Sequence, residues 1–588
     1  MKKRILSVLL AAVMLASAAG CAKNSGGSNP SEVDKTGQGG TAEFIKQDDK
    51  QAENLTSIHQ TQMDTSVELS DANLARLLEK GPDVSVQRDA ILNSTTEIKQ
   101  SASFIPGETY TGTAYYVSNS GSDTNAGTSP EQPWATLERV NSAALQRGDA
   151  VFFERGDIWY GRLTVSADEV TISAYGTGDK PILSGSDPDV GNPDRWKEHA
   201  KTQDGGTVWV YENAATDVTQ IFFNNGEEMG IRVTPNCDAD GYVDAQGKNF
   251  DVCEGLTEDL SFFCELELSE WNLSQTLADE YHEAKLYLRC DKGNPGEIFS
   301  DIQIMYTIYC IGNEFCGTVV DNLSIQYYGS LALSGGMGMS SSICDEYALV
   351  PSVTVQNCEV SYCGGGISNY HSDEGTIWQP DFSGGAFQLS GNGNRALNNY
   401  IHDVDYKVFV IAHHGQDDQG AGYEDITISG NLLVNNCCAL HLTDYSYWIA
   451  GKEDPCYFKN VCFSENTVLY TGFGWFRQQQ RSGQEYPDNA NLACIELCGN
   501  KHENDSITIR GNLFYGAELA LVFNPCSREN PDMPEAMNLK EPVFSGNTYV
   551  QYGYAGRHGD EVYPAALLES YVRDVLKDET GTIGHLPS

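Results

Sequence analysis

Histidine, aspartate and arginine side chains gather in one stretch of this chain, beside long polar loops. Five of the 11 histidines fall between residues 371 and 441. The residues at the ends of the expected strands are His371, His413, His414, His441, Asp444 and Arg477. Neighbouring strands of a sheet lie about 4.8 Å apart, so these side chains would line one strip if the strands stack. We predict that the strip binds substrate, although each residue taken alone is better explained as a ladder residue bonded to its neighbours.

Carboxylates gather in the same stretch, and a pair of them would suit cleavage of a glycosidic bond. In that reaction one carboxylic acid protonates the leaving oxygen, and the other carboxylate attacks the sugar or activates water. Asp405 stands between Val404 and Tyr406 at a strand entrance, which gives it a rigid support. Asp373 and Glu374 lie on the adjacent loop, so the predicted pair is Asp405 with one of these two. A solvated loop carboxylate is the plainer explanation for any one acid in so acidic a chain.

A polysaccharide lyase would use other residues of this stretch. β-Elimination needs a base beside the uronate carboxyl, often Lys or Arg, and a cation that neutralises the carboxyl. Lys407 and Arg477 could supply the base. Asp417 and Asp418 could hold Ca²⁺ through hard oxygen ligands, which makes Ca²⁺ a candidate cofactor of this second reaction. The structural alternative for Lys407 is a strand-edge residue whose ammonium reaches solvent.

Tryptophan side chains in and beside the same loops add a surface that suits sugars. They are Trp378, Trp448 and Trp475. Exposed rings stack on sugars because the C–H face of a pyranose is apolar and the face of the ring is negative. We predict that these three residues contact substrate; the alternative is that they fix the long loops to the wall.

A separate segment over residues 119–127 is dense in Asn, Asp and Gly. Asp123 and Asn125 have the Asp-x-Asn-x-Gly spacing that begins a Ca²⁺ loop, but the closing Glu is missing. We therefore expect a turn without metal at this position.

The elements that would position the histidine-rich stretch repeat along the second half of the chain. Each copy is a short alternating run, a turn centred on Asn, and another short run. The clearest copies contain Asn431, Asn466, Asn512 and Asn547, and looser ones contain Asn357 and Asn399. Copies lie 32 to 46 residues apart. A unit that cannot bury its own apolar face must stack on its neighbours, so this period predicts a solenoid of strands, or β-helix.

Shifts in composition and rhythm divide the chain into six parts. We expect a signal peptide over 1–20, a tether and N-terminal helical cap over 21–105, the first part of the β-helix over 106–185, a β-rich insertion over 186–318, the main β-helix over 319–555, and a C-terminal helix and tail over 556–588. Strand-like runs occur in the insertion without the Asn-centred turn. Caps are expected because an open solenoid end exposes unpaired strand edges.

One segment carries a family resemblance. Residues 115–137 read Tyr-Tyr-Val-Ser-x-Ser-Gly-Ser-Asp-x-Asn-x-Gly-Thr-Ser-Pro-x-x-Pro-Trp-x-Thr-Leu, and Arg-Gly-Asp-x-Val-x-Phe follows at 147–153. This pattern resembles the opening of secreted bacterial right-handed parallel β-helix proteins of the pectin-lyase-like superfamily. The resemblance implies an all-β fold of that type over residues 114–185 and 319–550. Its known members include polysaccharide lyases and glycoside hydrolases, and fold alone does not choose between them.

The N-terminus has the pattern of an export signal. Met-Lys-Lys-Arg precedes an apolar run from Ile5 to Ala16, which is too short for a permanent membrane span. Ala-Ala-Gly-Cys21 follows and resembles the bacterial lipobox, which implies lipidation of Cys21. An ordinary signal peptide cleaved elsewhere is the alternative. We expect a lipoprotein on the bacterial cell surface that meets the membrane through its lipid alone.

Composition narrows the class of partner. The 588 residues carry 82 acids against 37 bases, a formal net charge of −45. Such a surface disfavours nucleic acid and anionic membranes and suits neutral polymers. The 17 cysteines include no Cys-x-x-Cys pair, so a zinc knuckle is not expected, and those in the repeats would be small apolar residues inside the coils.

These patterns together predict a monomeric, surface-anchored protein that holds a polysaccharide along its β-helix and cleaves glycosidic bonds with a carboxylate pair. Two alternatives stay open: a polysaccharide lyase with a Lys or Arg base and Ca²⁺, and a non-catalytic carbohydrate-binding or adhesion protein. A lyase product would absorb ultraviolet light through its new C=C bond, a hydrolase product would gain a reducing end, and a binder would give neither.

Overall fold

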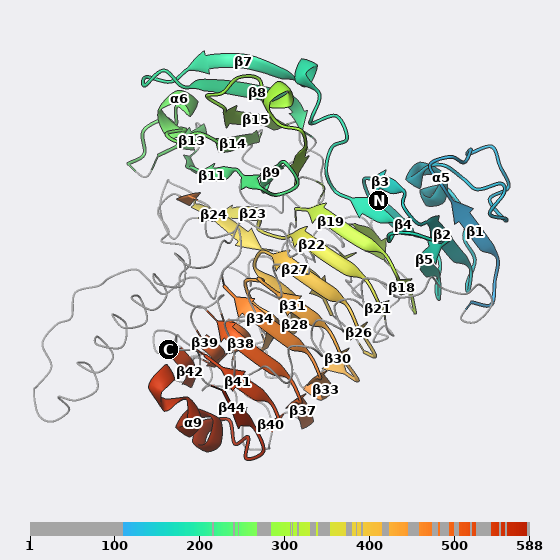
Figure 1. Ribbon diagram of the computed structural model, residues 1–588, viewed down its shortest axis with the longest axis vertical. Helices are drawn as coiled ribbons and strands as arrows, with labels where there is room; N and C mark the ends of the chain where they lie inside the picture. The colour runs from blue at the N-terminus through green and yellow to red at the C-terminus, as the bar shows by residue number, and fades with distance from the viewer. Residues whose placement is uncertain are drawn as a thin grey trace, which may run out of the picture.

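The computed structural model of the protein is mostly β and is built on long parallel sheets (Figure 1). The residues it describes are 110–214, 217–238, 241–244, 246–266, 284–305, 307, 310–313, 317–329, 337–338, 353–371, 379–383, 385–389, 392–413, 423–444, 458–472, 480–481, 493–498, 505–517, 520–524, 543–551, 554–558 and 561–584. The expected signal peptide, Cys21, the tether and the N-terminal cap lie outside these residues. No helix within the described ranges is long and apolar enough to cross a membrane.

Three long sheets, here called A, B and C, run along the molecule. Sheet A has 11 strands: β1 (Ala114–Val117), β2 (Ala150–Glu154), β5 (Thr171–Tyr175), β18 (Val319–Asp321), β21 (Thr354–Gln356), β26 (Arg395–Leu397), β29 (Tyr423–Glu424), β30 (Thr427–Ser429), β33 (Phe458–Ser464), β37 (Asp505–Arg510) and β40 (Phe544–Ser545). Sheet B has 10: β3 (Ile158–Tyr160), β6 (Ile182–Ser184), β19 (Ser324–Tyr328), β22 (Glu359–Cys363), β27 (Tyr400–Val404), β31 (Leu432–Val434), β34 (Thr467–Thr471), β38 (Leu513–Ala517), β41 (Thr548–Val550) and β44 (Thr582–Ile583). Sheet C also has 10: β4 (Leu163–Val165), β17 (Ile311–Asn313), β20 (Met337–Gly338), β25 (Gly385–Gln388), β28 (Lys407–His413), β32 (Leu440–Asp444), β36 (Ala493–Cys498), β39 (Ala520–Asn524), β42 (Tyr554–His558) and β43 (Glu561–Pro564).

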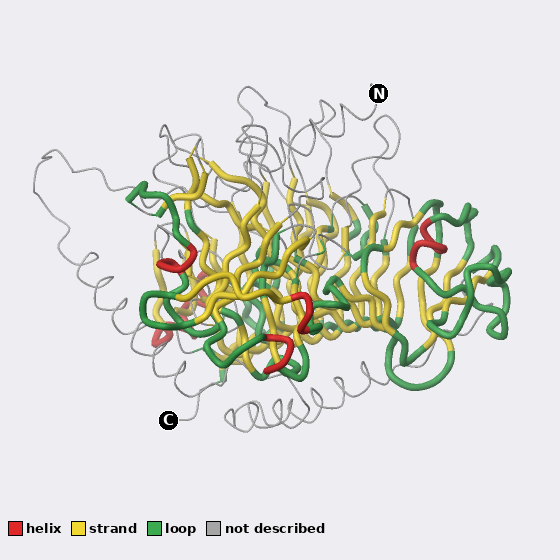
Figure 2. Tube along the Cα trace, turned by 90° about the horizontal axis from the view of Figure 1, so that it is seen from above, coloured by secondary structure: helices red, strands yellow, loops and turns green. Residues whose placement is uncertain are grey.

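The chain visits these sheets in a fixed order. Strands β26, β27 and β28 lie in sheets A, B and C, and β30, β31 and β32 repeat the order one level further on. Each strand pairs in parallel with its equivalent in the next coil, as in β27 with β31 and β28 with β32. The view from above shows the strands stacked side by side (Figure 2). The predicted stack of parallel strands is therefore confirmed at the level of its long parallel sheets.

Columns of apolar side chains hold the coils together. In sheet B, strand register aligns Leu183, Ile325, Val360, Ile401, Leu433, Val468, Phe514 and Tyr549. All of these residues are at most 1% exposed and belong to one continuous core. Full burial of each such side chain contributes about 1.5–3 kcal/mol, so the column is a large part of the folding free energy.

The Asn-centred turns lie at the corner between sheets A and B. Asn399, Asn431, Asn466, Asn512 and Asn547 form a ladder in which each Oδ1 accepts the backbone N–H and the Nδ2–H of the preceding Asn. Each Nδ2 also donates to a backbone carbonyl of the sheet A strand one coil earlier. The carboxylate of Asp578 ends the ladder by accepting both donors of Asn547 at 3.1 Å. One repeated amide thus satisfies the buried polar groups of each coil.

The segment that carries the family resemblance folds around Trp134. Gly127 has a φ of +75°, and a Cβ there would lie 2.3 Å from the Trp134 ring, so only glycine fits. Tyr115 stacks on Trp134 with ring centroids 4.6 Å apart. Asp123 accepts hydrogen bonds from the backbone N–H groups of Ala135 (2.9 Å) and Thr136 (3.1 Å) and from the Thr136 hydroxyl (2.7 Å). The carboxylate of Asp123 therefore anchors the residues that lead into the short helix α5 (Leu137–Asn141).

Residues between β6 and β17 form separate sheets with their own core, and we call this part the insertion (Figure 1). Its main sheet contains β7 (Trp196–Lys201), β8 (Thr207–Ala214), β11 (Ile231–Thr234), β14 (Ser261–Leu266) and β15 (Ala284–Arg289). Smaller elements are β9 (Ile221–Phe223), β10 (Glu228–Met229), β12 (Asn236–Asp238), β13 (Gly241–Val243), β16 (Ile302–Ile304), η3 (Pro193–Arg195), α6 (Val252–Gly255) and α8 (Pro295–Ile298). Parallel pairing of β35 (Gln480–Arg481) with β11 joins a late segment of the stack to the insertion.

The last coil is covered by a short run of helical turns. These are η7 (Ala565–Leu567), α9 (Leu568–Ser570) and η8 (Tyr571–Val575). Leu568, Tyr571, Val572 and Leu576 are buried in the main core, whereas Leu567 is 40% exposed. Tyr571 leaves no room for a side chain at Gly556, since a Cβ there would lie 2.1 Å from the ring. The run therefore covers the open end of the sheets.

Candidate functional site

The corner between sheets B and C places Asp405. Strand β27 ends at Val404, and β28 begins at Lys407 after a two-residue turn. Tyr406 has a φ of +70°, which turns the chain sharply. The Asp405 backbone N–H donates to the Cys363 carbonyl of the preceding coil at 2.8 Å, and its side chain is fully buried. The aspartate is thus fixed at a corner and not on a loop.

Two glycines make room for this aspartate. They are Gly364 and Gly365, which stand at the same corner one coil earlier with φ values of +95° and +76°. A Cβ on Gly364 would lie 2.3 Å from the Asp405 carbonyl oxygen, and one on Gly365 would lie 2.1 Å from its Oδ2. The Asp405 carboxylate therefore packs directly on the Gly365 backbone, and no other residue type fits there.

Lys407, His441 and Glu496 form a buried trio on three neighbouring strands of sheet C. His441 Nδ1 lies 2.7 Å from Glu496 Oε2, and Lys407 Nζ lies 3.4 Å from both Glu496 Oε2 and His441 Nε2. The exposed fractions are 2% for Lys407, 0% for His441 and 1% for Glu496. Strand register places His441 directly beside Glu496 in the stack. Two opposite charges and an imidazole thus share one buried site.

The charges of the trio follow from the surroundings of His441. Burial and the Lys407 ammonium lower the pKa of His441, and together they outweigh the opposing effect of Glu496. The imidazole is therefore neutral near pH 7. Its Nδ1–H then donates to Glu496, and its Nε2 accepts from Lys407. The trio holds one ammonium, one neutral ring and one carboxylate, so its net charge is zero.

A second buried cluster stands on sheet B around His402. His402 Nδ1 lies 2.9 Å from Asp403 Oδ2, and Nε2 lies 3.4 Å from Glu359 Oε1. Burial lowers the pKa of His402, but the two carboxylates outweigh it and raise the pKa to about 9. Asn435 donates to Asp403 Oδ1 at 2.6 Å, and the Tyr400 ring stacks on the imidazole at 4.5 Å. His402 is thus an imidazolium at neutral pH, the reverse of His441.

The structure brings some of the predicted site residues together and separates others. Lys407 and His441 are in contact, and Asp405 lies one turn residue away from Lys407. His413 stands opposite Asp444 in the strand register, for which the backbone alone is described. His441 stands opposite Val410, so it is not level with His413 as a single strip would require.

His371 does not take the place that we expected. The strand that ends there, β23 (Gly366–His371), pairs antiparallel with β24 (Gln379–Ser383) in a separate two-stranded hairpin. The strand of that coil in sheet C is β25, which follows the hairpin. The prediction that His371 lies on the strip with His441 is therefore wrong, because an unrecognised hairpin was counted as part of the wall.

Several predicted residues lie outside the described residues. These are Asp373, Glu374, Trp378, His414, Trp448, Trp475 and Arg477, together with the Ca²⁺ candidates Asp417 and Asp418. Their assignments stay predictions. Asp373 and Glu374 follow β23 in the chain.

Glu496 is the residue that sequence reasoning missed. It is the one acid of β36, which reads Ala-Cys-Ile-Glu-Leu-Cys. An acid between large apolar residues of a strand is a weak signal for a buried ion pair, and the sequence of β36 shows this pattern. The partner could not be inferred because 54 residues separate His441 from Glu496 in sequence, including a loop of unusual length.

Asp123 of residues 119–127, where a turn was expected and Ca²⁺ was the alternative, is bonded to the start of the next helix. The two Asp123 carboxylate oxygens accept three hydrogen bonds from Ala135 and Thr136. Burial raises the pKa of Asp123, and these hydrogen bonds outweigh it, so the pKa is lowered. The carboxylate therefore has a full structural role.

Repeat cysteines such as Cys358, Cys363 and Cys494 are buried, and burial raises the pKa of each thiol to about 12.

Comparisons with known proteins give local similarity and weak structural likeness. No family model matches the chain. A 107-residue segment is 38% identical to a lacto-N-biosidase of Bifidobacterium longum subsp. longum, which is 16% of this chain and only 6% of that protein. The solved complex of XylC with xylose has a TM-score of 0.35 at 10% identity, covering 76% of this chain and 62% of that chain. A GH136 lacto-N-biosidase from Eubacterium ramulus has a TM-score of 0.28 at 12% identity, covering 81% and 68%.

Proposed function

We propose that the protein is an extracellular carbohydrate-active enzyme that binds a glycan on its stacked sheets and hydrolyses a glycosidic bond. We also propose that its stack is a right-handed parallel β-helix of the pectin-lyase-like type. The order A, B, C of successive strands and the motif around Trp134 support the fold. The segment that is 38% identical to a lacto-N-biosidase supports glycoside hydrolysis.

One observation carries the proposal: four ionisable side chains are buried at one corner of the stack and on the strands of sheet C beside it. They are Asp405, Lys407, His441 and Glu496, each at most 2% exposed. Burial of charged groups is unfavourable, and apolar residues of similar volume often stabilise a protein as well or better. Buried charged clusters are enriched at functional sites, and structural ion-pair networks such as the one around His402 form them too. We infer that the corner is retained for catalysis.

Asp405 is the proposed catalytic carboxyl because the corner turn and two glycines fix its position. Hydrolysis needs a second carboxyl group on the other side of the bond. Glu496 is the candidate among the described residues, because Lys407, which follows the turn of Asp405, forms an ion pair with the Glu496 carboxylate. Asp373 and Glu374 remain candidates as first predicted. Because all four corner residues are buried, the proposal includes an opening of the corner when glycan binds.

The geometry favours hydrolysis over β-elimination. The lyase alternative assigned Lys407 as the base that takes a proton from the sugar. Its Nζ instead lies 3.4 Å from Glu496, in a buried ion pair. An ammonium in such a pair is a hydrogen-bond donor and has no lone pair for a substrate proton. We therefore assign Lys407 to orient Glu496.

The test is a screen of purified protein against a glycan panel, read by mass, with lacto-N-biose-terminated oligosaccharides included. Asp405→Asn should then lower kcat on the identified substrate by at least about 100-fold, the usual contribution of a general acid or base. Its melting temperature should stay close to that of the wild type. Asp403→Asn is the matched control, a buried aspartate two residues away in the His402 cluster. Full turnover by Asp405→Asn would remove this residue from the mechanism.

The cellular location remains a proposal of the same kind. We propose a monomeric lipoprotein on the bacterial cell surface, anchored through Cys21. Cys21→Ala should move the protein from the membrane fraction to the soluble fraction when the cells are fractionated. Retention of the variant in the membrane fraction would show that another feature attaches it.

A further inference from the structure

A buried arginine of the insertion reaches the corner that holds Asp405. Arg232, on β11, is 2% exposed and forms a two-oxygen ion pair with Asp217, at 2.8 Å to Oδ1 and 2.7 Å to Oδ2. Its Nη1 donates to the Gly365 carbonyl of the stack at 3.2 Å. Both bonds to Asp217 come from Nη2, so the ion pair holds one end of the guanidinium and leaves Nη1 to donate to the stack. Asp217 therefore aims Arg232 at Gly365.

Gly365 transmits this contact to Asp405. Its Cα faces the Asp405 carboxylate so closely that a Cβ would lie 2.1 Å from Oδ2. Any movement of the Gly364–Gly365 turn would therefore move the carboxylate or open space beside it. The turn is bonded on its other side too, since the Gly364 N–H donates to the Tyr328 carbonyl at 3.0 Å.

Other contacts hold the insertion against the same corner. Phe222 and Met229 of the insertion share a small core with Tyr362 and Cys437 of the stack. The rings of Phe222 and Tyr362 are 4.7 Å apart. Beside Arg232 on β11, Val233 stands in register with Gln480 of β35. The insertion thus meets the stack at the turns that flank Asp405, with apolar and polar contacts together.

We propose that Arg232 is a positioning residue, which sets the place of the Asp405 carboxylate through the Gly364–Gly365 turn. The insertion is then part of the active site and not a separate module. This inference rests on the proposed role of Asp405 in hydrolysis. A carboxyl that must meet a glycosidic oxygen loses about 100-fold in rate when it is misplaced by about 1 Å.

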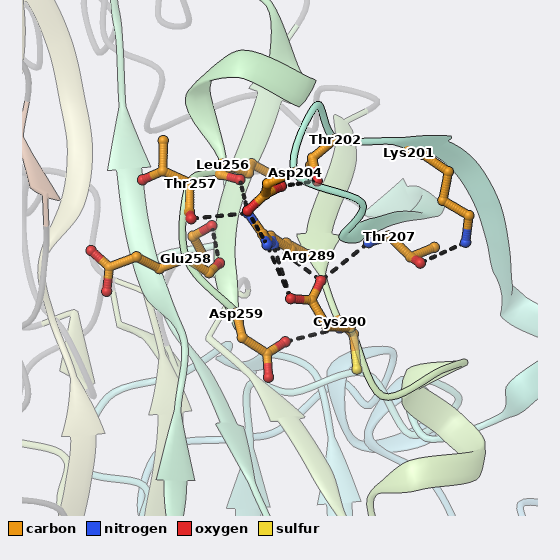
Figure 3. A network of polar contacts seen from close by, with 12 residues as sticks. Lys201, Thr202, Asp204, Thr207, Leu256, Thr257, Glu258, Asp259, Arg289 and Cys290 are labelled. Atoms are coloured by element: carbon orange, nitrogen blue, oxygen red, sulfur yellow. Dashed lines mark hydrogen bonds and ion pairs between the residues drawn. The ribbon is translucent and has the colours of Figure 1, made fainter.

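A second arginine of the insertion supplies a matched control. Arg289 is 6% exposed and pairs with Asp204 at 2.8 Å and Asp291 at 3.0 Å. Figure 3 shows it among Asp204, Leu256 and Thr257, and it donates to the carbonyls of the last two. These partners all belong to the insertion. Arg289 is therefore a buried, carboxylate-paired arginine whose described polar contacts all lie within the insertion.

The experiment compares Arg232→Lys with Arg289→Lys at a temperature well below both melting transitions. A lysine keeps the charge but loses the fork that reaches Gly365. Arg232→Lys should lower kcat by about 10- to 100-fold with KM within about twofold, and should shift the limb of the kcat–pH profile that Asp405→Asn removes. Arg289→Lys should lower the melting temperature and leave kcat and the pH profile unchanged. Gly365→Ala should lower kcat at least as much as Arg232→Lys.

The outcomes separate this inference from the proposed function. If Asp405→Asn is inactive while Arg232→Lys matches Arg289→Lys in kcat and pH profile, Arg232 is merely structural and the inference fails. If Asp405→Asn keeps full turnover, the proposed role of Asp405 fails first. A variant of Arg232 that does not fold is replaced by Asp217→Asn, which keeps the arginine but removes the group that aims it, and the same kinetic comparison decides.

Discussion

Two corners of the same stack fill their buried polar positions with different kinds of side chain. At the corner between sheets A and B, one neutral side chain repeats, and five asparagines satisfy each other from coil to coil. At the corner between sheets B and C, glycines, an aspartate and cysteines follow one another, and charged groups are buried next to them. The first arrangement is what stability alone selects. The second buries charge, which is unfavourable for stability, and this difference supports the proposal that the catalytic site lies there.

The largest expected effect on stability comes from breaking the charged corner on one side. Lys407→Met removes the ammonium that pairs with Glu496 and leaves the buried carboxylate without it. Loss of one partner of a buried ion pair typically destabilises by about 3–5 kcal/mol. Urea unfolding measures this change. Lys197→Met, which removes an exposed ion pair with Glu212, should leave the free energy of unfolding nearly unchanged. Equal small effects would mean that the buried pair is not formed.

The neutral corner is tested in the middle of its ladder. Asn466→Ala removes an acceptor used by two donors of Asn431 and donors to Ile428 and Asn512. Because buried donors and acceptors then lack hydrogen-bond partners, the free energy of unfolding should fall by about 3 kcal/mol, while kcat stays unchanged. Asn398→Gly is the control, since Asn398 is exposed beside the ladder and glycine keeps its positive φ. A drop in kcat with Asn466→Ala would contradict a purely structural ladder.

A smaller and pH-dependent effect distinguishes the two buried histidines. The folded-state pKa of His402, about 9, exceeds the ordinary value of 6.5, so its contribution to stability is complete below pH 6.5 and is lost as the pH rises through 9. His441 has a lowered pKa, so stability is lost as the pH falls below 6.5. We expect His402→Gln to flatten the decline in melting temperature between pH 6.5 and 9. The exposed His199→Gln should leave that decline intact.

The smallest expected effect is at the end of the ladder. Burial raises the pKa of Asp578, but hydrogen bonds from Asn547 and Gly546 outweigh it, so the pKa is lowered. Its contribution to stability is therefore present above the ordinary pKa of 3.8 and is lost as the pH falls below that value. Asp578→Asn should destabilise by about 1 kcal/mol at pH 7 and remove part of the acid sensitivity. Calorimetry from pH 2.5 to 7 measures both, with the exposed Asp574→Asn as the control.

Sequence reasoning succeeded where one residue repeats at one position. The asparagines marked the A–B corner because each coil must satisfy the same buried backbone groups, so the same side chain recurs. The motif around Trp134 was recognisable for a similar reason, since Gly127 and Asp123 answer strict local requirements. Such local requirements can be recognised from the amino-acid sequence alone.

The candidate site was only partly legible. Asp405 and His441 could be chosen because they stand at the ends of expected strands, and Lys407 because it could serve as a base; Lys407 and His441 are in contact. Glu496 was missed because its partner His441 lies 55 positions earlier in the sequence. The hairpin after Gly365 displaced His371 because nothing in the sequence distinguishes a strand of the wall from a strand that leaves it. Irregular insertions remove the regular spacing from which the strand register could be predicted.

The central claim is that the charges at the B–C corner serve chemistry and not stability. The most direct measurement is kcat and the free energy of unfolding of one apolar replacement of the trio, Lys407→Met with His441→Leu and Glu496→Leu. The account predicts a folded protein at least as stable as the wild type and without turnover on the glycan identified by the screen. A variant that keeps wild-type turnover would contradict the account.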